Sequence, residues 1–366
     1  MRSARAVVAL AVALAVLLTG CGPTDAGSAP SPSTTDHRPL AELDLAENPR
    51  AWVGPSSAVL ADERIEPIAE NPEQHLPATI ISHDHSGDRT VMVDDTSRVI
   101  ALDLAGSIAA TVWGLGLGST LVGRDMSTTF EGTENLPVVT SGAHAVNAEA
   151  VLALRPTLVI TDGTVGPRDV LEQLRSAGID VVFVENELSF DGAAELARQI
   201  GAALGVPETG AALATRVTED VADKIAEVAG ITPSDPADRV RVIFLYLRGG
   251  SGITYLFGSE SGADVLIEAL GGVDVASEVG WTGMKPVTDE ALIAADPDLI
   301  LVMTDGLASV GGVDGLIETK PALALTGAGE NRRIVDMADG DILSFGPRSA
   351  AVLDALARAI YAPVKG

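Results

Sequence analysis

The sequence predicts an α/β protein of two lobes, each with a mainly parallel sheet, joined by a long helix. Short apolar runs alternate with amphipathic segments from about residue 96 onward, which is typical of parallel α/β arrangements. The segment 149–160 reappears without a gap as 290–301, with Glu, Ala, Pro and Leu at equivalent places, so we expect a pseudo-two-fold repeat. Residues 208–229 give about six helical turns without a proline, enough to connect two lobes.

The first residues, 1–20, resemble a lipoprotein signal peptide. Arg2 and Arg5 precede the apolar run 6–18, which is too short to span a bilayer comfortably but suits the core of an export signal. The sequence Leu18-Thr19-Gly20-Cys21 resembles the lipobox, which implies cleavage before the cysteine, its lipidation, and anchoring at the outer face of the cytoplasmic membrane. The chain has no second cysteine, so we expect the mature protein to fold without an intramolecular disulfide.

The formal net charge of −27 limits the classes of partner. Nucleic-acid binding requires a basic surface, so this composition argues against it. An anionic bilayer would also repel such a surface, so we expect contact with the membrane through the lipid anchor alone. High solubility is sufficient to account for the charge.

The chain before the second lobe divides into three regions. Residues 21–40 are rich in Gly, Pro, Ser and Thr, and we expect a flexible tether. Residues 41–95 are an acidic segment, which we expect to pack on or near the first lobe, with short strands at 78–82 and 90–94. For the first lobe, residues 96–190, the pattern predicts strands at 99–102, 121–123, 158–161 and 181–184 and helices at 107–115, 148–154 and 168–176.

Residues 191–238 are expected to connect the lobes through a helix at 191–204 and an interlobe spine at 208–229. We expect this stiff spine to limit the lobes to a small relative rotation. Residues 239–366 form the expected second lobe. Its pattern predicts strands at 240–246, 299–303 and 333–336 and a last helix at 350–361.

This arrangement resembles the helical-backbone solute-binding proteins of ABC importers for haem, siderophores and cobalamin, over roughly residues 95–360. An acidic segment before the first lobe is also found in haem-binding lipoproteins of actinobacterial haemin importers. Four short segments are similar to that group, and these are Ser141–Asn147, Phe244–Gly249, Ser309–Leu316 and Leu343–Arg348. The resemblance implies a monomer that carries ferric haem b, with an ABC permease dimer, its ATPase and surface haem-donor proteins as partners.

The resemblance assigns His144 and Tyr246 as the two axial ligands of the haem iron. His144 lies in a loop before a first-lobe helix, and Tyr246 ends the first strand of the second lobe, where ligands of open α/β sheets gather. Imidazole and tyrosine both ligate haem iron, and a phenolate favours the ferric state. Arg248 is two residues further on, so it would share a face with Tyr246 and stabilise its phenolate. We therefore expect haem to enter edge-in and to be clamped by one ligand from each lobe.

Three further side chains are candidates for the same pocket. Met303 ends a strand of the second lobe, and we expect it to form part of the wall, although a thioether can also ligate haem iron. Lys285 and Arg348 are candidates for steering the haem propionates, with surface ion pairs as the alternative. The rest of the pocket should be apolar.

Glu149 and Glu290 occupy equivalent places in the two repeat units. In the wider family, glutamates at these places bind arginines of the two permease subunits, so the resemblance implies a docking role. Two acidic patches related by a pseudo-two-fold axis suit a symmetric dimer, which would release haem by pulling the lobes apart. A carboxylate also stabilises the N-terminus of a helix, and the two roles are compatible.

Three alternatives stay open. A ferric-siderophore or cobalamin binding protein would share the fold, the anchor and the paired glutamates, without needing His144 and Tyr246. A zinc or manganese binding protein is a weaker alternative, because His83-Asp84-His85 has no further His or Cys nearby and favours a structural loop. An enzyme is the weakest, because the chain has neither a Gly-x-Ser-x-Gly elbow nor a phosphate-binding glycine loop. We therefore expect no catalytic activity.

Overall fold

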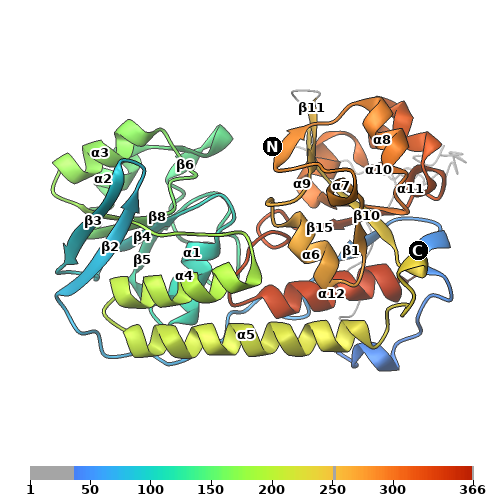
Figure 1. The fold of residues 1–366 in the computed structure, drawn as a ribbon. Helices are drawn as coiled ribbons and strands as arrows, with labels where there is room; N and C mark the ends of the chain where they lie inside the picture. Colours follow the sequence, from blue (N-terminus) through green and yellow to red (C-terminus); the bar gives the residue numbers. More distant parts are fainter. Residues whose placement is uncertain (1–36, 250–252, 365–366) are drawn as a thin grey trace, which may run out of the picture. The chain divides into compact units, whose positions relative to one another are not determined.

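The computed structural model describes residues 37–249 and 253–364, whose arrangement is drawn in Figure 1. These residues belong to one compact unit. The expected signal peptide 1–20, Cys21 and most of the expected tether lie outside the described residues, and stay predictions. Within the described ranges, no helix combines the length and the apolar character that crossing a bilayer requires.

Four parallel strands form the sheet of the first lobe, in the order β5-β4-β8-β9. They are β4 (Val99–Leu102), β5 (Leu121–Arg124), β8 (Leu158–Thr161) and β9 (Asp180–Phe183). Both faces are buried, because alternate side chains such as Val99 and Ile100 enter two different apolar clusters. Two helices cover each face, namely α1 (Ser107–Gly114) with α4 (Phe190–Ala203), and α2 (Ala148–Ala153) with α3 (Arg168–Ser176).

The sheet of the second lobe is mixed and has the order β1-β15-β14-β10-β11-β13, with β12 beside β10. Its parallel centre consists of β10 (Arg241–Arg248), β14 (Leu299–Met303) and β15 (Ile334–Met337). The strands β11 (Ile253–Phe257) and β13 (Met284–Pro286) extend it antiparallel, and β12 (Val273–Asp274) runs parallel to β10. Its short helices are α6 (Ala263–Ala269), α7 (Val275–Glu278), α8 (Asp289–Ala295), α9 (Thr304–Ser309), α10 (Gly312–Thr319) and α11 (Gly327–Glu330).

The expected interlobe spine is α5 (Pro207–Ala229), which packs against α4 of the first lobe and α12 (Ser349–Tyr361) of the second (Figure 1). An ion pair joins α5 to α12, because Lys224 Nζ lies 2.8 Å from Asp354 Oδ1. Within α12, Arg358 Nε lies 2.5 Å from the other oxygen of the same carboxylate, Asp354 Oδ2. The prediction of two α/β lobes with mainly parallel sheets and a long helix between them is confirmed.

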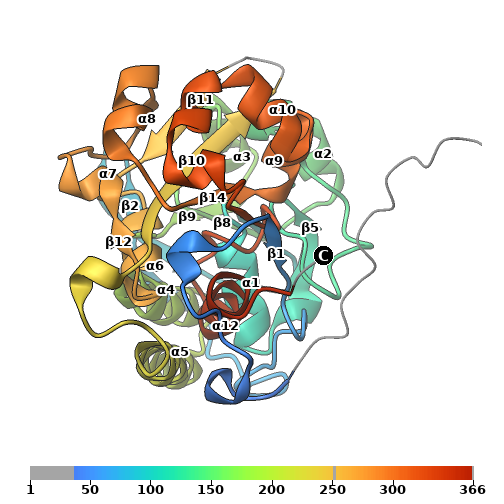
Figure 2. The same ribbon diagram turned by 90° about the vertical axis from the view of Figure 1, so that its right-hand side faces the viewer.

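The acidic segment before the first lobe is divided between the two lobes. The hairpin of β2 (Ala78–Asp84) and β3 (Gly87–Val93) contacts β9 and α4 of the first lobe. The strand β1 (Ser56–Ala58) instead pairs in parallel with β15 and lies beside α12 (Figure 2). The expectation that residues 41–95 pack on or near the first lobe is therefore wrong for β1, because the open edge of β15 offers unpaired backbone groups to an extended segment.

The folded body also begins before residue 41. Leu40 is fully buried, and its N–H donates to Glu227 Oε1 of α5 at 2.8 Å. Arg358 of α12 donates to the carbonyl oxygen of Arg38 at 2.6 Å. The expected tether 21–40 therefore extends too far at its C-terminal end, because a single apolar residue such as Leu40 is easily overlooked beside a polar stretch.

The two units of the pseudo-repeat have the same local structure, since α2 leads into β8 and α8 leads into β14. The side chains of Asn147 and Thr288 accept backbone N–H groups at the N-termini of these helices. After each helix the chain passes through a residue with positive φ directly before a proline, Arg155 at 47° and Asp296 at 39°. Equivalent positions of α2 and α8 therefore face the core or the solvent in the same way.

Candidate ligand-binding site

Tyr246 lies on β10, on a sheet face that is rich in aromatic side chains. Antiparallel pairing places it opposite Tyr255 of β11. Its ring centroid is 6.3 Å from that of Tyr255 and 6.0 Å from that of Phe257. Met303, at the end of β14, shares this face because Phe244 pairs with Leu301 and side chains alternate along both strands. Tyr246 and Met303 are both half-buried against the main apolar cluster, so their outer parts remain accessible.

Arg248 lies against the Tyr246 side chain. Its Nε–H donates a hydrogen bond to Tyr246 Oη, and its guanidinium carbon lies 5.3 Å from the centre of the Tyr246 ring. The alternation of side chains along a strand puts both residues on one face, as the sequence predicts. A guanidinium only donates hydrogen bonds, so the contact suits a negatively charged oxygen.

The end of β10 rests on helix α9. Gly249 follows Arg248 directly and donates its backbone N–H to Ser309 Oγ at 3.0 Å, while Ser309 Oγ donates to the carbonyl oxygen of Gly306 at 2.6 Å. A Cβ at Gly249 would lie 1.9 Å from the Ser309 carbonyl oxygen. Only glycine permits this approach, which fixes the part of the strand that carries Tyr246 and Arg248.

His144 lies in a short irregular loop of the first lobe. A 3-10 turn, Gly142–His144, connects the two-residue strands β6 (Thr140–Ser141) and β7 (Ala145–Val146). His144 has a φ of 57°, in the left-handed region that residues with a Cβ rarely adopt. Its Nδ1 is buried and has no hydrogen-bond partner among the described residues. A buried atom is not open to a ligand, so Nε2 is the ring nitrogen of His144 that could face one.

His144 and Arg248 come from different lobes and influence each other. Burial lowers the pKa of His144, and the positive charge of Arg248 lowers it further. The imidazole is therefore neutral at pH 7 and keeps a lone pair for a metal. Because the interaction of two charges falls with distance, this effect requires the two side chains to approach each other. His144 therefore lies within reach of the charge of Arg248, which is itself hydrogen-bonded to Tyr246.

Three residues around this group were not predicted from the sequence, namely Asp339, Tyr255 and Ser309. Asp339 follows β15 and accepts the N–H of Asp305 at 2.9 Å. Burial raises the pKa of Asp339, and the nearby charge of Arg248 opposes that rise. The rule that found Tyr246, a functional side chain at the end of a parallel strand, also applies to Asp339. The alternation of side chains along the strand 253–257 could have indicated that Tyr255 faces the site. Ser309 lies in a segment that resembles the haem-binding lipoproteins, but the resemblance assigned no role to that residue.

Arg348 does not join this neighbourhood. It is only 6% exposed, its Nη1 lies 2.7 Å from Asp341 Oδ1, and its guanidinium stacks over the Phe130 ring at 5.5 Å. The expectation that Arg348 steers propionates is wrong, because its charge is already paired inside the protein.

The Lys285 side chain is also poorly placed for the propionates. Lys285 pairs with Leu256, whose side chain enters the cluster on the sheet face turned away from Tyr246. Side chains at paired positions share a face, so Lys285 points away from the Tyr246 side of the sheet. The expectation that Lys285 steers propionates is therefore also wrong.

The residues His83-Asp84-His85 lie at the end of β2, where Asp84 is engaged by arginines. Its carboxylate lies 2.6 Å from Arg89 Nε and 2.5 Å from Arg175 Nη2. In the part of the chain that the structure describes, no group of three or more His, Cys, Asp or Glu side chains is placed to hold a metal ion. The carboxylate of Asp84 has a structural role here, joining the hairpin to α3.

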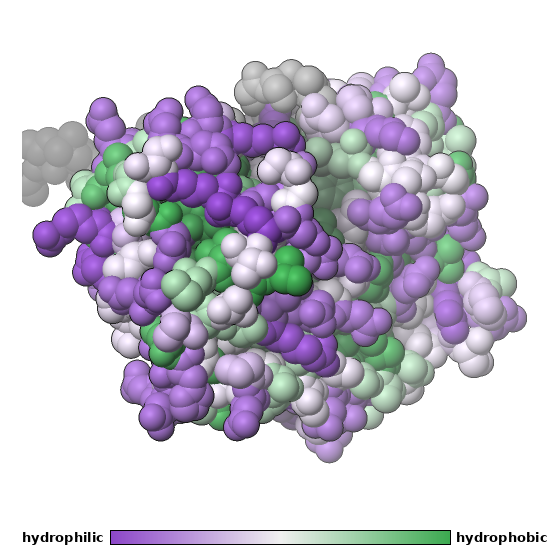
Figure 3. All heavy atoms as spheres, turned by 60° about the vertical axis from the view of Figure 1, so that its left-hand side comes forward, coloured by the Kyte–Doolittle hydropathy of each residue, from purple (hydrophilic) through white to green (hydrophobic). Residues whose placement is uncertain are grey.

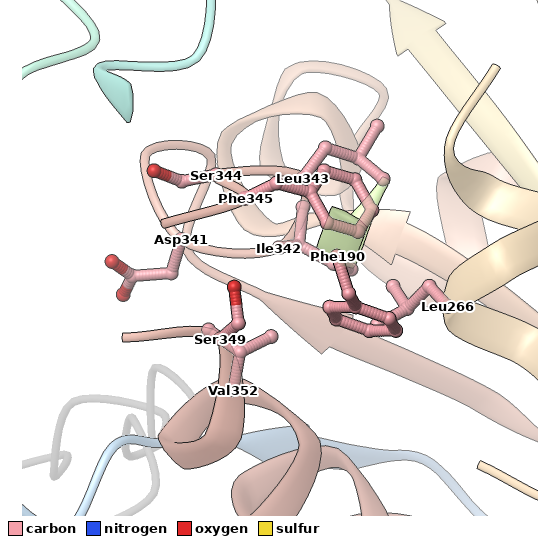
Figure 4. A pocket seen from close by; sticks show the side chains of 9 residues that line it. All are labelled: Phe190, Leu266, Asp341, Ile342, Leu343, Ser344, Phe345, Ser349 and Val352. Atoms are coloured by element: carbon pink, nitrogen blue, oxygen red, sulfur yellow. The ribbon is translucent and has the colours of Figure 1, made fainter. Parts of the chain in front are cut away.

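A small pocket lies where α4 meets the segment before α12 (Figure 4). Its volume is about 10 Å³, and the rings of Phe190 and Phe345 meet there edge to face with centroids 5.2 Å apart. Pockets for organic ligands usually exceed about 300 Å³, so we assign this space to packing. Its lining residues are Phe190, Leu266, Asp341, Ile342, Leu343, Ser344, Phe345, Ser349 and Val352.

Glu149 and Glu290 are exposed in the first turns of α2 and α8. Neither side chain forms an ion pair within residues 37–249 and 253–364. Their equivalent positions in the two repeat units match the sequence analysis. Both carboxylates therefore face solvent without a competing partner in the described structure.

The chain is similar to a known protein family and to solved structures of binding proteins. A model of the periplasmic binding protein family matches residues 100–339. The haem-binding protein HmuT is similar with a TM-score of 0.80 and 38% sequence identity, over 86% of this chain and 99% of that chain. Structures of HmuT with an arginine, a histidine or a tyrosine replaced by alanine are similar to the same degree.

Two sequence relatives have transport-related names. The cobalamin-binding protein of Halobacterium salinarum is 31% identical over 239 residues, 63% of this chain, and the match spans 62% of that relative's length. The uncharacterized ABC transporter substrate-binding lipoprotein YvrC of Bacillus subtilis is 26% identical over 296 residues, 80% of this chain and 88% of that relative. The expected actinobacterial subgroup stays a prediction.

Proposed function

We propose, because this chain belongs to the periplasmic binding protein family, that it captures ferric haem outside the cytoplasm and delivers it to an ABC importer. The family and the relatives named above are binding proteins, and on that ground we expect no catalysis. Haem is the cargo in this proposal.

One observation carries the proposal: Arg248 lies against the Tyr246 hydroxyl and close enough to His144 to lower its pKa. A neutral imidazole and a phenolate backed by a guanidinium are suited to the two axial positions of ferric haem. The tyrosine and the arginine replaced in the HmuT structures are two positions apart, as Tyr246 and Arg248 are. We therefore assign His144 and Tyr246 as axial ligands and Arg248 as their support.

The proposed cargo is haem b, held without covalent bonds. The only cysteine is Cys21, at the proposed lipid anchor, so thioether attachment of the porphyrin has no partner in the body. We infer that the porphyrin packs against Met303, which is half-buried on the Tyr246 face. An apolar wall with few polar groups is typical of such sites.

The proposed partners are an ABC permease dimer with its ATPase, and surface proteins that donate haem. Glu149 and Glu290 would bind one permease subunit each, because they are exposed at equivalent places. We further propose that residues 1–20 are removed, that Cys21 is lipidated at the outer face of the cytoplasmic membrane, and that the protein acts as a monomer. The lipoprotein YvrC, named as an ABC transporter substrate-binding protein, supports this type of anchoring and partner.

Titration of the purified protein with haemin tests the ligand assignment. The wild-type chain should give an intense Soret band that saturates. Tyr246→Phe should weaken ferric haem binding about 100-fold and change the spectrum, because it removes an anionic ligand, and His144→Ala should also change it. Arg248→Ala should weaken binding about 10-fold, as the loss of a supporting hydrogen bond to a metal ligand usually does.

Tyr255→Phe is the matched control, since it removes a hydroxyl from the neighbouring ring on the same sheet face. It should leave the spectrum and the affinity unchanged. Equal spectra and affinities for wild type, Tyr246→Phe and His144→Ala would rule out the axial assignment.

Cobalamin is the second candidate ligand, because a relative of that name is 31% identical over 239 residues. Parallel titrations with haemin and cyanocobalamin separate the two. Saturable binding of cyanocobalamin together with an unchanged haemin spectrum would reverse the proposal in favour of cobalamin. A ferric siderophore binding protein would likewise give no Soret band.

A further inference from the structure

An exposed aliphatic residue follows each of the two docking glutamates at the same distance. Leu152 comes three residues after Glu149, and Ile293 comes three residues after Glu290. Each aliphatic side chain is 42% exposed. Residues three apart lie on one face of a helix, so each helix presents a carboxylate and an aliphatic group side by side.

The fold does not require these aliphatic side chains. The inward positions of the two helices are already filled by Val151 and Leu292, which are fully buried. A single exposed leucine carries little information, because apolar residues occur in small groups on the mostly hydrophilic surface, as Figure 3 shows for one face. The informative point is that the same exposed position is aliphatic in both copies.

Another exposed position of the repeat has diverged. Arg155 of the first unit corresponds to Asp296 of the second, so the charge is reversed there. The glutamate and the aliphatic residue are thus retained beside a position whose charge is reversed. The exposed Ala153 and Ala294 are also identical, but an alanine offers little surface to a partner, so the glutamate and the larger aliphatic residue are the groups that indicate a shared contact.

The chemistry of the pair restricts what binds it. A carboxylate calls for a basic side chain, and an aliphatic group calls for an apolar pocket that excludes water around the ion pair. An anionic lipid surface would repel Glu149 and Glu290. Two equivalent patches fit a partner that presents the same surface twice, which is a property of a symmetric dimer.

We propose that Glu149 with Leu152, and Glu290 with Ile293, form two equivalent docking patches. Each patch binds one subunit of the permease dimer through a basic side chain beside an apolar pocket. This inference rests on the proposed function and adds the two aliphatic residues and the kind of surface they meet. The aliphatic contacts hold the complex together, while the glutamates set its orientation.

The test uses the full-length, lipidated protein in proteoliposomes with the haem ABC transporter of its cell. ATPase stimulation is measured against the concentration of haemin-loaded protein. Leu152→Ser and Ile293→Ser should each raise the half-maximal concentration about 10-fold, because each removes a central apolar contact. The double variant should raise it further, and Leu152→Met and Ile293→Leu should restore it.

Matched controls are Ile81→Ser on β2 and Leu325→Ser, at aliphatic residues that are 57% and 66% exposed and lie outside the repeat helices. They should leave the half-maximal concentration unchanged. Unchanged stimulation by the Leu152 and Ile293 variants, or an equal loss in the two controls, would overturn the inference. The Soret band separates the two proposals. A wild-type chain that does not bind haemin contradicts the proposed function. A chain that binds haemin but does not stimulate the transporter contradicts the docking proposal alone.

Discussion

The two lobes support their candidate iron ligands in different ways. Tyr246 lies in an eight-residue strand at the centre of a sheet, with Arg248 on its hydroxyl and Gly249 pressed on helix α9. His144 lies in a three-residue turn between two-residue strands, in a left-handed conformation. The second lobe therefore presents its ligand on a central strand, and the first lobe presents one in a short turn.

This difference predicts that small changes in the backbone should be tolerated next to His144 and not next to Tyr246. A ligand that is held by a sheet and a helix loses its geometry when either moves. A ligand on a short loop can be recovered by a local adjustment. The first two predictions compare the lobes on this point.

Among the changes that compare the two lobes, Gly249→Ala should have the largest effect. Its Cβ would lie 1.9 Å from the Ser309 carbonyl oxygen, so the strand end or α9 must shift. Haemin affinity should fall about 10-fold or more, with a changed Soret spectrum, because the shift displaces Tyr246 and Arg248. Gly142→Ala is the matched control in the His144 turn, where a Cβ meets nothing within 4 Å. If both variants lose affinity equally, the contrast between the lobes is wrong.

A smaller effect is expected for Ser309→Ala. This change removes the acceptor of the Gly249 N–H but leaves the backbone contact in place. The loss of one hydrogen bond typically costs about 1 kcal/mol, so haemin affinity should fall about fivefold. Ser309→Thr keeps the hydroxyl and should restore both affinity and spectrum. An alanine variant with wild-type behaviour would show that the backbone approach alone fixes β10.

Much of the fold follows from periodicity in the sequence. The strands predicted at 99–102, 158–161 and 299–303 and the helix at 168–176 match the structure at both ends. These elements are continuous apolar runs or strongly amphipathic segments with polar residues, proline or glycine near their ends, so their local pattern is sufficient. The long helix at 208–229 is predicted to within one residue at its start.

Other elements depend on partners that a local pattern does not reveal. β1 is the short sequence Ser56–Ala58, and it becomes a strand because β15 has an open edge. Arg348 has the composition of a surface residue, but Asp341 and Phe130 enclose it after folding. In the candidate site, the spacing of Tyr246 and Arg248 predicts their contact. The approach of His144 from the other lobe was expected only from the family resemblance. The effect of the Arg248 charge on the pKa of His144 supports that approach.

The smallest expected effect is on the pKa of His144. It is also the most direct test of whether His144 approaches Arg248. Two causes lower this pKa: burial of the ring, which is the larger, and the charge of Arg248. Both disfavour the imidazolium ion, so the haem-free wild-type protein should titrate below the ordinary value of about 6.5. Arg248→Met removes the charge, together with the hydrogen bond to Tyr246, but leaves the burial of the His144 ring, so the pKa of His144 should rise but stay below that value.

The measurement is an NMR titration of the haem-free protein, with the His144 signal assigned through His144→Gln. Protons and iron compete for the same nitrogen of His144. As the pH is lowered, Arg248→Met should therefore lose haemin binding at a higher pH than wild type, because its His144 pKa is higher. Arg241→Met, which removes a charge at the opposite end of β10, should leave the His144 pKa unchanged. A His144 pKa that does not respond to Arg248→Met would mean that the two lobes do not bring these side chains together, and the axial pair would lose its geometric support.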